Sequence, residues 1–416
     1  MIIWSWLRRT LLNAVGRDVT LIRIRRVGRL VETGSPTTPF RLLDASGEEV
    51  PAVARFFREL VANDYSPASV RSYGLALLRW LRFLDAIEIQ WDRATRAEVV
   101  DFVLWLRQAK KPGRPNKHAG QINAMTKKPH LGTGYAPATI DHGTSVLKEF
   151  YNHHLAAGNG PLVNPVRPVR TESGERINAH HNPLQRFAPH RRAPLRQRRP
   201  PRIPKAIPDQ MFNELFAQMT SHRDRALLAF FISTGARASE LVGVPRADTD
   251  VGQQLIGVVR KGTRVLQWLP TSPDAFVWLR LYQQALPAAA PRGPGAPLWV
   301  TMRRPFAPLS YDAARMVFNR ANAALGSNWT LHDLRHTAAH RMIQDPALSL
   351  TDVQWVLGHA RLTTTELYLT PDQDEVIGRM RLHHQAPSPA AVPVKPVRPG
   401  EGYRADVLST LLGLPQ

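Results

Sequence analysis

Six side chains suited to phosphate chemistry follow one another along the second half of the chain. They are Arg237, Lys261, His332, Arg335, His359 and Tyr368. Arginine carries a permanent charge and offers a fork of N–H donors that fits a phosphate group. A tyrosine hydroxyl becomes a useful nucleophile when neighbouring cations favour its phenolate. The set therefore predicts cleavage of a phosphodiester, with Tyr368 attacking and the cations stabilising the phosphate.

His332 and Arg335 are expected in the first turns of one helix. Thr330 and Asp333 fit a Thr-x-x-Asp variant of the N-cap pattern. Free backbone amides and the helix dipole favour an anion there, and Arg335 shares a face with His332. His336, one turn on, is expected to support the site. A surface helix with unrelated polar groups explains this motif alone equally well.

The same histidines raise the question of a metal ion. His332, His336 and His340 fall four residues apart and share one helix face. A zinc site of this type also needs a glutamate between the first two histidines, and the chain has Asp-Leu-Arg there. We therefore expect neither a metal ion nor another cofactor.

Arg237 is expected where one helix stops and another begins. Phe230 and Ile232 indicate a buried helix that breaks at Gly235, after which Arg237 opens the next segment. Glu240 follows three residues later and is expected to orient nearby basic groups. Arg237 and Arg335 together offer two guanidinium forks to a phosphate, which suits the extra negative charge of its transition state.

Lys261 is expected in a hairpin turn. Two short β-rich runs flank the sequence Lys-Gly-Thr-Arg over residues 261–264. The chain has nine lysines against 46 arginines, and Lys261 is the only lysine between Lys205 and Lys395. An ammonium can protonate an alkoxide leaving group, whereas a guanidinium does not give up its proton. Lys261 is therefore a candidate general acid; a solvated turn lysine is the alternative.

Gly358 is expected to end a helix whose inner face includes Val353, Val356 and Leu357, with His359 pointing into the site. Residues 363–365 would then cap the segment that carries Tyr368. An unperturbed tyrosine has a pKa of about 10, so Tyr368 needs cations nearby to act as a nucleophile. A core tyrosine within Leu-Tyr-Leu is the alternative interpretation.

Upstream, apolar stripes and capping residues predict a helical unit over residues 50–159. Ser66 and Thr95 are expected N-caps, a last helix is expected over about 137–157, and residues 110–136 are expected as a loop or insertion. Arg71, Arg79 and Arg82 are expected on a face open to solvent or DNA. A generic helical domain with solvated arginines is the alternative.

The remaining segments divide by composition. Residues 1–49 form an N-terminal extension with possible strands over 19–30, and 160–206 form a basic, proline-rich linker. The linker is expected either to follow a phosphate backbone or to act only as a flexible connection. Residues 207–385 form a second folded unit, and 386–416 form a tail with a possible helix over 406–414. The linker arginines expected to contact DNA are Arg191, Arg192, Arg196, Arg198 and Arg199.

The bulk composition points to a polyanionic partner. The chain has 55 Lys and Arg against 33 Asp and Glu, a formal charge of +22, which favours nucleic acid. No apolar run approaches the ~18 residues of a membrane span. The absence of cysteine excludes disulfides, thiolate zinc sites and cysteine nucleophiles. Charge follows the apolar residues at the N-terminus, opposite to a secretory signal, so we expect a cytoplasmic protein.

These blocks resemble the tyrosine recombinases, or phage integrase family, which includes Xer-type and lambda-integrase-type enzymes. The family pattern TGLRxSEL, a GKG-type hairpin lysine, HxLRH, LGH and a late tyrosine appears here as TGARASEL, RKGTR, HDLRH, LGH and Tyr368, nine residues after His359. The resemblance covers most of residues 207–375 and weakens over 50–165, which looks like the family's core-binding domain. Ala236 replaces a larger apolar residue.

The resemblance implies a mainly α fold with a small β-hairpin or sheet. A helical core-binding domain and a C-terminal catalytic domain would form a C-shaped clamp on DNA. Tyr368 would form a 3′-phosphotyrosyl bond while Arg237, Arg335 and His332 stabilise the phosphorane. Lys261 would protonate the 5′ oxygen, and His359 would help to bind the phosphate.

The resemblance also implies partners and a setting. These are double-stranded recombination sites, a homotetramer in which the C-terminal segment packs on a neighbour, and accessory recombinases or DNA-bending proteins. The expected location is bacterial cytoplasm at the nucleoid, and the expected role is DNA integration or transposition of a mobile element. The alternatives are DNA relaxation like that of a type IB topoisomerase, or a catalytically idle DNA-binding protein on the same fold.

Overall fold

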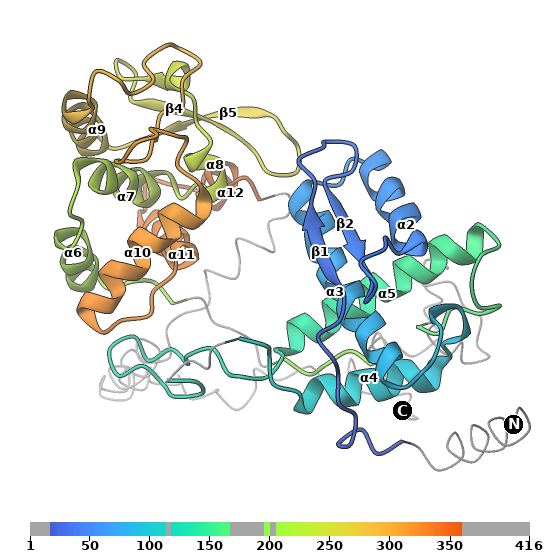
Figure 1. Cartoon of the computed structure of the whole chain (residues 1–416). Helices are drawn as coiled ribbons and strands as arrows, with labels where there is room; N and C mark the ends of the chain where they lie inside the picture. Colours follow the sequence, from blue (N-terminus) through green and yellow to red (C-terminus); the bar gives the residue numbers. More distant parts are fainter. Residues whose placement is uncertain (1–16, 114–117, 167–194, 200–204, 360–416) are drawn as a thin grey trace, which may run out of the picture. The chain divides into compact units, whose positions relative to one another are not determined.

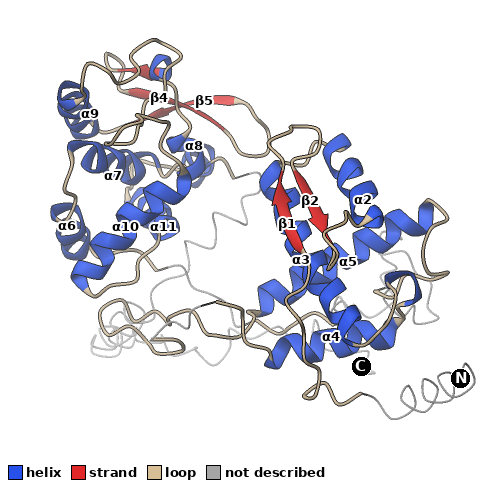
Figure 2. Ribbon diagram, in the orientation of Figure 1, coloured by secondary structure: helices blue, strands red, loops and turns tan. Residues whose placement is uncertain are grey.

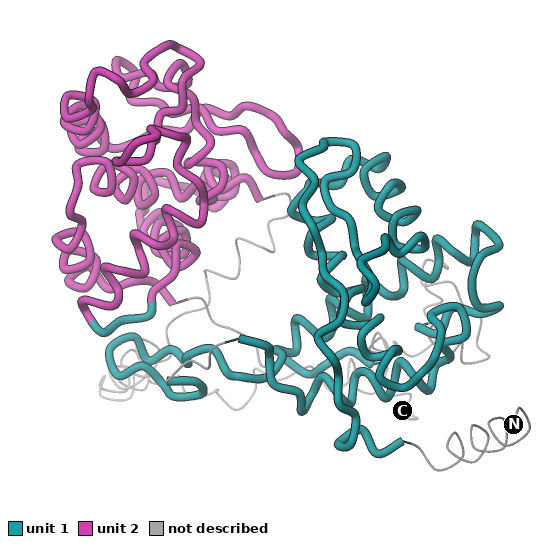
Figure 3. Tube along the Cα trace, viewed as in Figure 1, with its two compact units in different colours: residues 1–202, 326–328 teal, residues 203–325, 329–416 magenta. Residues whose placement is uncertain are grey.

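The computed structural model of the chain describes residues 17–113, 118–166, 195–199 and 205–359 (Figure 1). It is mainly helical, with two small antiparallel sheets (Figure 2), which confirms the predicted fold class. The chain divides into two compact units, which are residues 1–202 with 326–328 and residues 203–325 with 329–416 (Figure 3). Within the described ranges, no helix is long and apolar enough to cross a membrane.

The first unit is built on helices that begin where their capping residues predict. Ser66 accepts a hydrogen bond from the Ser69 amide at 3.2 Å, and Thr95 forms a capping box with Glu98. Residues 110–136 carry only isolated β-bridges in their described part, as expected for a loop. The elements are α2 (Pro51–Ala62), α3 (Pro67–Ala86), the 3₁₀ turn η1 (Trp91–Arg93), α4 (Arg96–Gln108) and α5 (Pro137–Ala156).

Aromatic side chains fill the core of this unit. Trp80, Phe83 and Phe102 pack together from α3 and α4, and Phe150 and Tyr151 come from α5. The Trp80 indole N–H donates to the Tyr151 hydroxyl at 2.9 Å, so these two buried polar groups are satisfied. Full burial of each large side chain contributes about 1.5–3 kcal/mol. The helices therefore hold a fixed surface for the arginines of α3.

The N-terminal strands lie later in the chain than predicted. An antiparallel pair, β1 (Arg29–Glu32) and β2 (Phe40–Leu43), packs on α3, with Arg29 opposite Leu43. Residues 17–28 form no strand, so the expectation of strands over 19–30 is wrong except at its last two residues. The carbonyl groups of Val27 and Gly28 bond instead to the Arg82 side chain. A strand needs a neighbouring strand to pair with, and the alternation of residue types in this segment does not reveal whether one exists.

The second unit combines helices with one three-stranded antiparallel sheet of order β3-β4-β5. Phe230, Tyr282 and Trp299 form the centre of its core, and the Tyr282 and Trp299 rings stack at 5.9 Å. The elements are α6 (Asp209–Ala217), α7 (His222–Thr234), α8 (Ala238–Val242), η2 (Arg246–Asp248), β3 (Thr249–Asp250), β4 (Leu255–Val259), β5 (Leu266–Pro270), α9 (Pro273–Ala285), α10 (Tyr311–Leu325), α11 (Leu331–Gln344) and α12 (Leu350–Leu357).

Gly235 brings the end of α7 against α11 and α12. It has φ +60°, in the left-handed region that favours glycine. A Cβ at this position would lie 2.8 Å from Leu357 Cδ2 and 3.3 Å from Ala338 Cβ. The predicted break at Gly235 is confirmed, and its closeness to the two later helices gathers the distant motifs.

Candidate active site

Arg237 stands at the opening of α8, as predicted. Its Nη1 donates to Glu240 Oε1 at 2.8 Å, and its backbone N–H donates to Glu240 Oε2 at 3.1 Å. The Arg237 side chain remains 34% exposed. Glu240 thus holds one edge of the guanidinium while another part of it faces solvent, where a phosphate could bind.

Glu240 is the buried centre of the site. Its side chain is 1% exposed, and it also accepts from Arg260 Nη1 at 3.1 Å and from the Lys261 backbone N–H at 2.9 Å. Burial alone would raise the pKa of Glu240, but the Lys261 amide, the two Arg237 hydrogen bonds and the Arg237 charge together hold it below its usual value. One ionised carboxylate therefore links α8 to the chain that leaves β4.

Lys261 lies in the turn between β4 and β5, which confirms the predicted hairpin. Val258 pairs with Gln267, and residues 260–265 connect the two strands. The Lys261 side chain is exposed while its backbone N–H is fixed on Glu240. The turn therefore presents a flexible ammonium from an anchored backbone.

The start of α11 confirms the predicted cap. Asp333 N–H donates to Thr330 Oγ1 at 3.3 Å, and Thr330 N–H donates to Asp333 Oδ2 at 2.7 Å. His332 is exposed in the first turn, whereas Arg335 is buried. The His332 and His336 ring centres lie 4.2 Å apart, so both histidines sit beside the same helix start.

Arg335 joins three of the motifs that the sequence separates. Its Nη1 donates to the Gly235 carbonyl at 2.8 Å, and its Nη2 donates to the Leu357 carbonyl at 2.8 Å. The same Nη2 lies 2.8 Å from His359 Nε2. Because a guanidinium only donates, His359 Nε2 must accept, which leaves the imidazole proton on Nδ1.

The electrostatics of His359 agree with that tautomer. Burial lowers its pKa, and the charges of Arg335, Arg237 and Arg260, with His332, lower it further, to about 4. His359 is therefore neutral near pH 7 and offers an Nδ1–H donor. Its place is fixed by Gly358, which ends α12 with φ +64°, and by Gln354 Nε2, which donates to the His359 carbonyl at 3.0 Å.

Several predicted residues lie outside the described part of the chain. These are the candidate nucleophile Tyr368, its expected capping residues 363–365, the possible helix over 406–414, and the linker arginines Arg191 and Arg192. Arg196 and Arg198 are described and exposed, and Arg199 pairs with Asp141 of α5. The structure therefore gathers Arg237, Lys261, His332, Arg335 and His359 in one unit.

The three arginines of α3 differ from one another, although the sequence predicted one common open face. Arg71 is exposed, and Arg79 is half-buried, 5.6 Å from the centre of the Tyr135 ring. Arg82 donates to the carbonyls of Val27 and Gly28 at 2.6 and 2.7 Å, so it anchors the N-terminal extension. Arg82 is therefore only partly exposed, because two carbonyl groups bind its guanidinium.

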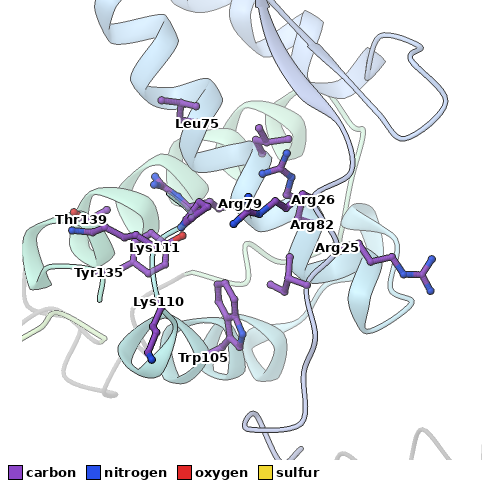
Figure 4. A pocket seen from close by; sticks show the side chains of 13 residues that line it. Arg25, Arg26, Leu75, Arg79, Arg82, Trp105, Lys110, Lys111, Tyr135 and Thr139 are labelled. Atoms are coloured by element: carbon purple, nitrogen blue, oxygen red, sulfur yellow. The ribbon is translucent and has the colours of Figure 1, made fainter. Parts of the chain in front are cut away.

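A basic cavity of about 670 Å³ opens beside Arg79 in the first unit (Figure 4). No carboxylate lines it among the described residues. Burial lowers the pKa of Arg79, which means that its charge is partly desolvated and would gain from an anion. The basic lining residues are Arg25, Arg26, Arg79, Arg82, Lys110 and Lys111, with Trp105 and Tyr135 beside them.

Two residues of the site escaped the sequence analysis. Arg260 and Gln267 bond to each other and to the end of α12. The available signal was strand alternation, because Arg260 falls on the same strand face as the apolar residues Ile256 and Val258. A buried arginine requires a partner, and Glu240 was the candidate.

The histidines of α11 were also considered as metal ligands. Across the ranges that the structure describes, no group of three or more histidine, cysteine, aspartate or glutamate side chains is arranged to hold a metal ion.

Two family models match the chain. The model of the phage integrase family matches residues 204–375, and that of the phage integrase N-terminal SAM-like domain matches residues 53–117. The tyrosine recombinase XerD of Neisseria meningitidis serogroup A is 31% identical over 202 residues, 46% of this chain and 68% of the relative. The tyrosine recombinase XerC of Rhodospirillum centenum is 27% identical over 323 residues, 74% of this chain and 86% of the relative.

Solved structures share the fold. A lambda integrase dimer bound to a COC′ core site matches with a TM-score of 0.52 at 15% identity, over 85% of this chain and 95% of that one. XerH bound to a palindromic difH substrate matches with a TM-score of 0.51 at 14% identity, over 82% and 92%. With the matched motifs gathered around Glu240 and Arg335, these relationships place the chain in the phage integrase family, the tyrosine recombinases.

Proposed function

We propose that this protein is a site-specific DNA recombinase that cuts and rejoins DNA through a covalent bond to Tyr368. Its family consists of DNA strand-transferring enzymes, and both family models match in their expected order. The observation that carries the proposal is Arg335, which bonds to the Gly235 turn, the end of α12 and His359 at once. Those contacts assemble a phosphate-binding set from segments about 100 residues apart.

Each residue has a chemical role in the proposed step. Tyr368 attacks the phosphorus as its phenolate, which the neighbouring cations favour, a P–O bond to tyrosine forms at the 3′ end, and the P–O5′ bond breaks. Lys261 gives its proton to the departing 5′ oxygen. Arg237, Arg335 and His332 stabilise the charge of the pentavalent phosphorus, to which neutral His359 donates from Nδ1.

Rejoining is the reverse of that step. A 5′-hydroxyl attacks the phosphotyrosine, Lys261 takes up its proton, and Tyr368 leaves. The energy of the broken P–O bond is kept in the phosphotyrosine, so no nucleotide is hydrolysed. Attack by a 5′-hydroxyl from a second DNA site would exchange partners, which separates recombination from relaxation.

The DNA-binding surface is proposed to include Arg71 and Arg79 of α3 with the basic cavity. The linker arginines Arg191, Arg192, Arg196 and Arg198 would contact the phosphate backbone, where they add sequence-independent affinity. Arg199 would do so only after release from Asp141.

The assembly and setting are proposed from related proteins. The matched lambda integrase structure holds a dimer on DNA, and a transposon Tn1549 integrase in complex with circular intermediate DNA matches with a TM-score of 0.50. We place this protein as a homotetramer on two double-stranded sites in the bacterial cytoplasm at the nucleoid. Segment 406–414 would pack on a neighbouring subunit, accessory recombinases or DNA-bending proteins would assist, and a mobile element would be the substrate.

A nicked suicide substrate tests the reaction class. DNA fragments trapped on the protein are sequenced to find the site, and a nick is placed so that the cleaved 5′ end diffuses away. A 3′-linked adduct that survives SDS is expected, with a free 5′-hydroxyl. Fast relaxation of plasmids that lack the recovered site would favour the topoisomerase alternative. Binding to the site without any adduct would favour the idle DNA-binding protein.

A further inference from the structure

Arg260 is a buried arginine beside the candidate general acid. It is 5% exposed and follows β4 directly, one residue before Lys261. Burial lowers the pKa of Arg260, and the Glu240 carboxylate opposes that shift. Burying a charged group has a desolvation cost of several kcal/mol per ion. The buried position of Arg260 therefore indicates a structural or functional role.

The Arg260 guanidinium bonds to three different elements. Nη1 donates to Glu240 of α8 at 3.1 Å, and Nε donates to Gln267 Oε1 of β5 at 2.7 Å. Nη2 donates to the Val356 carbonyl in the last turn of α12. Gln267 extends this connection, because its Nε2 donates to the Trp355 carbonyl at 3.0 Å.

The last carbonyls of α12 are therefore held by side chains. Trp355 bonds to Gln267, Val356 bonds to Arg260, and Leu357 bonds to Arg335. Terminal helix carbonyls have no partner within the helix, and cations near them are favoured by the dipole. His359, and the chain that continues to Tyr368, begin directly after this clamped end.

Gly358 leaves room for this contact. A Cβ at Gly358 would lie 2.9 Å from Arg260 Nε and 3.0 Å from Arg260 Cζ. The glycine therefore serves two purposes, since it adopts φ +64° and lets the guanidinium lie against the backbone. The end of α12 and the hairpin are fitted to each other at this point.

We propose that Arg260, assisted by Gln267, is a positioning residue that fixes the clamped end of α12, and hence His359, against Glu240 and Arg237. The inference rests on the proposed function. Without Arg260, Glu240 would still hold Arg237, but α12 would lose the bond at Val356 and keep the weaker link from Gln267 to Trp355. Misplacing a phosphate-binding group such as His359 by about 1 Å can reduce the reaction rate by ~10²-fold.

The test measures the rate of adduct formation with full-length protein saturating a suicide substrate. Arg260→Gln is expected to slow this single-turnover rate by about ten- to a hundredfold while DNA affinity is unchanged. Gln267→Met, which removes both of its side-chain bonds, is expected to slow it less. Arg280→Gln, which removes an exposed arginine of α9, loses the same charge and is expected to behave as wild type.

A sulfur-bridged substrate separates the two routes by which Arg260 could act. Replacing the 5′ oxygen at the cleavage site with sulfur gives a leaving group that needs no general acid. The Arg260→Gln defect is expected to persist on this substrate, because it arises at α12 and not at Lys261. Full rescue by sulfur would overturn the assignment to α12.

The pH profile gives a readout that loss of stability alone would not move. Burial and the charges of Arg335, Arg237, Arg260 and His332 depress the pKa of His359, so removing the Arg260 charge raises that pKa. The acidic limb of the rate profile is then expected to move to higher pH in Arg260→Gln. In Arg260→Lys, which keeps the charge, the acidic limb is expected to stay at its wild-type pH.

The outcomes are distinct. If wild-type protein forms no adduct, the proposed function fails and this inference fails with it. If wild type forms the adduct and Arg260→Gln does so equally fast, only the positioning role is refuted. If Arg260→Gln does not fold, Gln267→Met decides, and a wild-type rate in that variant would count against the role.

Discussion

Replacing Glu240 with alanine should lower the free energy of unfolding of the second unit more than replacing an exposed carboxylate would. Its carboxylate accepts from two backbone amides and from the side chains of Arg237 and Arg260. Arg260 is buried, so removal of Glu240 leaves a buried charge without its carboxylate. Breaking a buried ion pair from one side costs about 3–5 kcal/mol. A loss of that size is a large fraction of the ~5–15 kcal/mol that stabilises a typical domain.

Urea denaturation of the full-length chain measures the loss, and hydrogen exchange locates it. The extra exchange in Glu240→Ala should concentrate in α8, β4 and β5, while the first unit keeps its protection. Asp274→Ala removes an exposed carboxylate from the first turn of α9 and should cost less than about 1 kcal/mol. If Glu240→Ala costs no more than this control, the carboxylate does not hold the site together.

Three further results are expected. Gly358→Ala should lose about 1–3 kcal/mol in thermal unfolding, because φ is +64° and the new Cβ would meet a guanidinium. Gly326 has the same φ, but its new Cβ would have no atom within 4 Å, so Gly326→Ala should lose less stability. Equal losses in the two variants would refute the steric contribution of Arg260. Burial holds the pKa of His154 at about 4, below its ordinary value, so stability should fall as pH drops from about 6.5 to about 4. His154→Gln should flatten that slope, and an unchanged slope would contradict it. Arg79→Gln should lower the salt dependence of DNA binding by ~1 in log–log slope, whereas exposed Arg93→Gln should not.

Local signals allowed much of the fold to be predicted. Thr330 with Asp333, Thr95 with Glu98, and Ser66 are caps whose side chains bond within three residues, so their partners are visible in the sequence. Gly235 and Gly358 were recognisable in the same way, because the helix before each must end in the left-handed region.

Long-range partners were not predictable in this way. Arg82 was expected on an open face because it lies outside the apolar stripe of its helix. Its partners are backbone carbonyl groups 54 and 55 residues earlier in the chain. The contact between Arg260 and the end of α12 spans 96 residues, and the acceptor is a backbone carbonyl that any residue type could supply. The residue types at these two positions therefore do not indicate that they are in contact. Arg237 and Arg335 were predicted from local signals, the helix break at Gly235 and the Thr330 cap, and the resemblance to a known family linked the two positions.

We propose that Tyr368 is the nucleophile of a phosphate-binding set that Glu240 and Arg335 hold in place. The most direct measurement combines the suicide substrate with mass spectrometry of the trapped peptide. Wild-type protein should carry DNA on Tyr368 alone, Tyr368→Phe should form no adduct while still binding DNA, and exposed Tyr311→Phe should react like wild type. An adduct that persists in Tyr368→Phe, or that maps to another residue, would refute Tyr368 as the nucleophile.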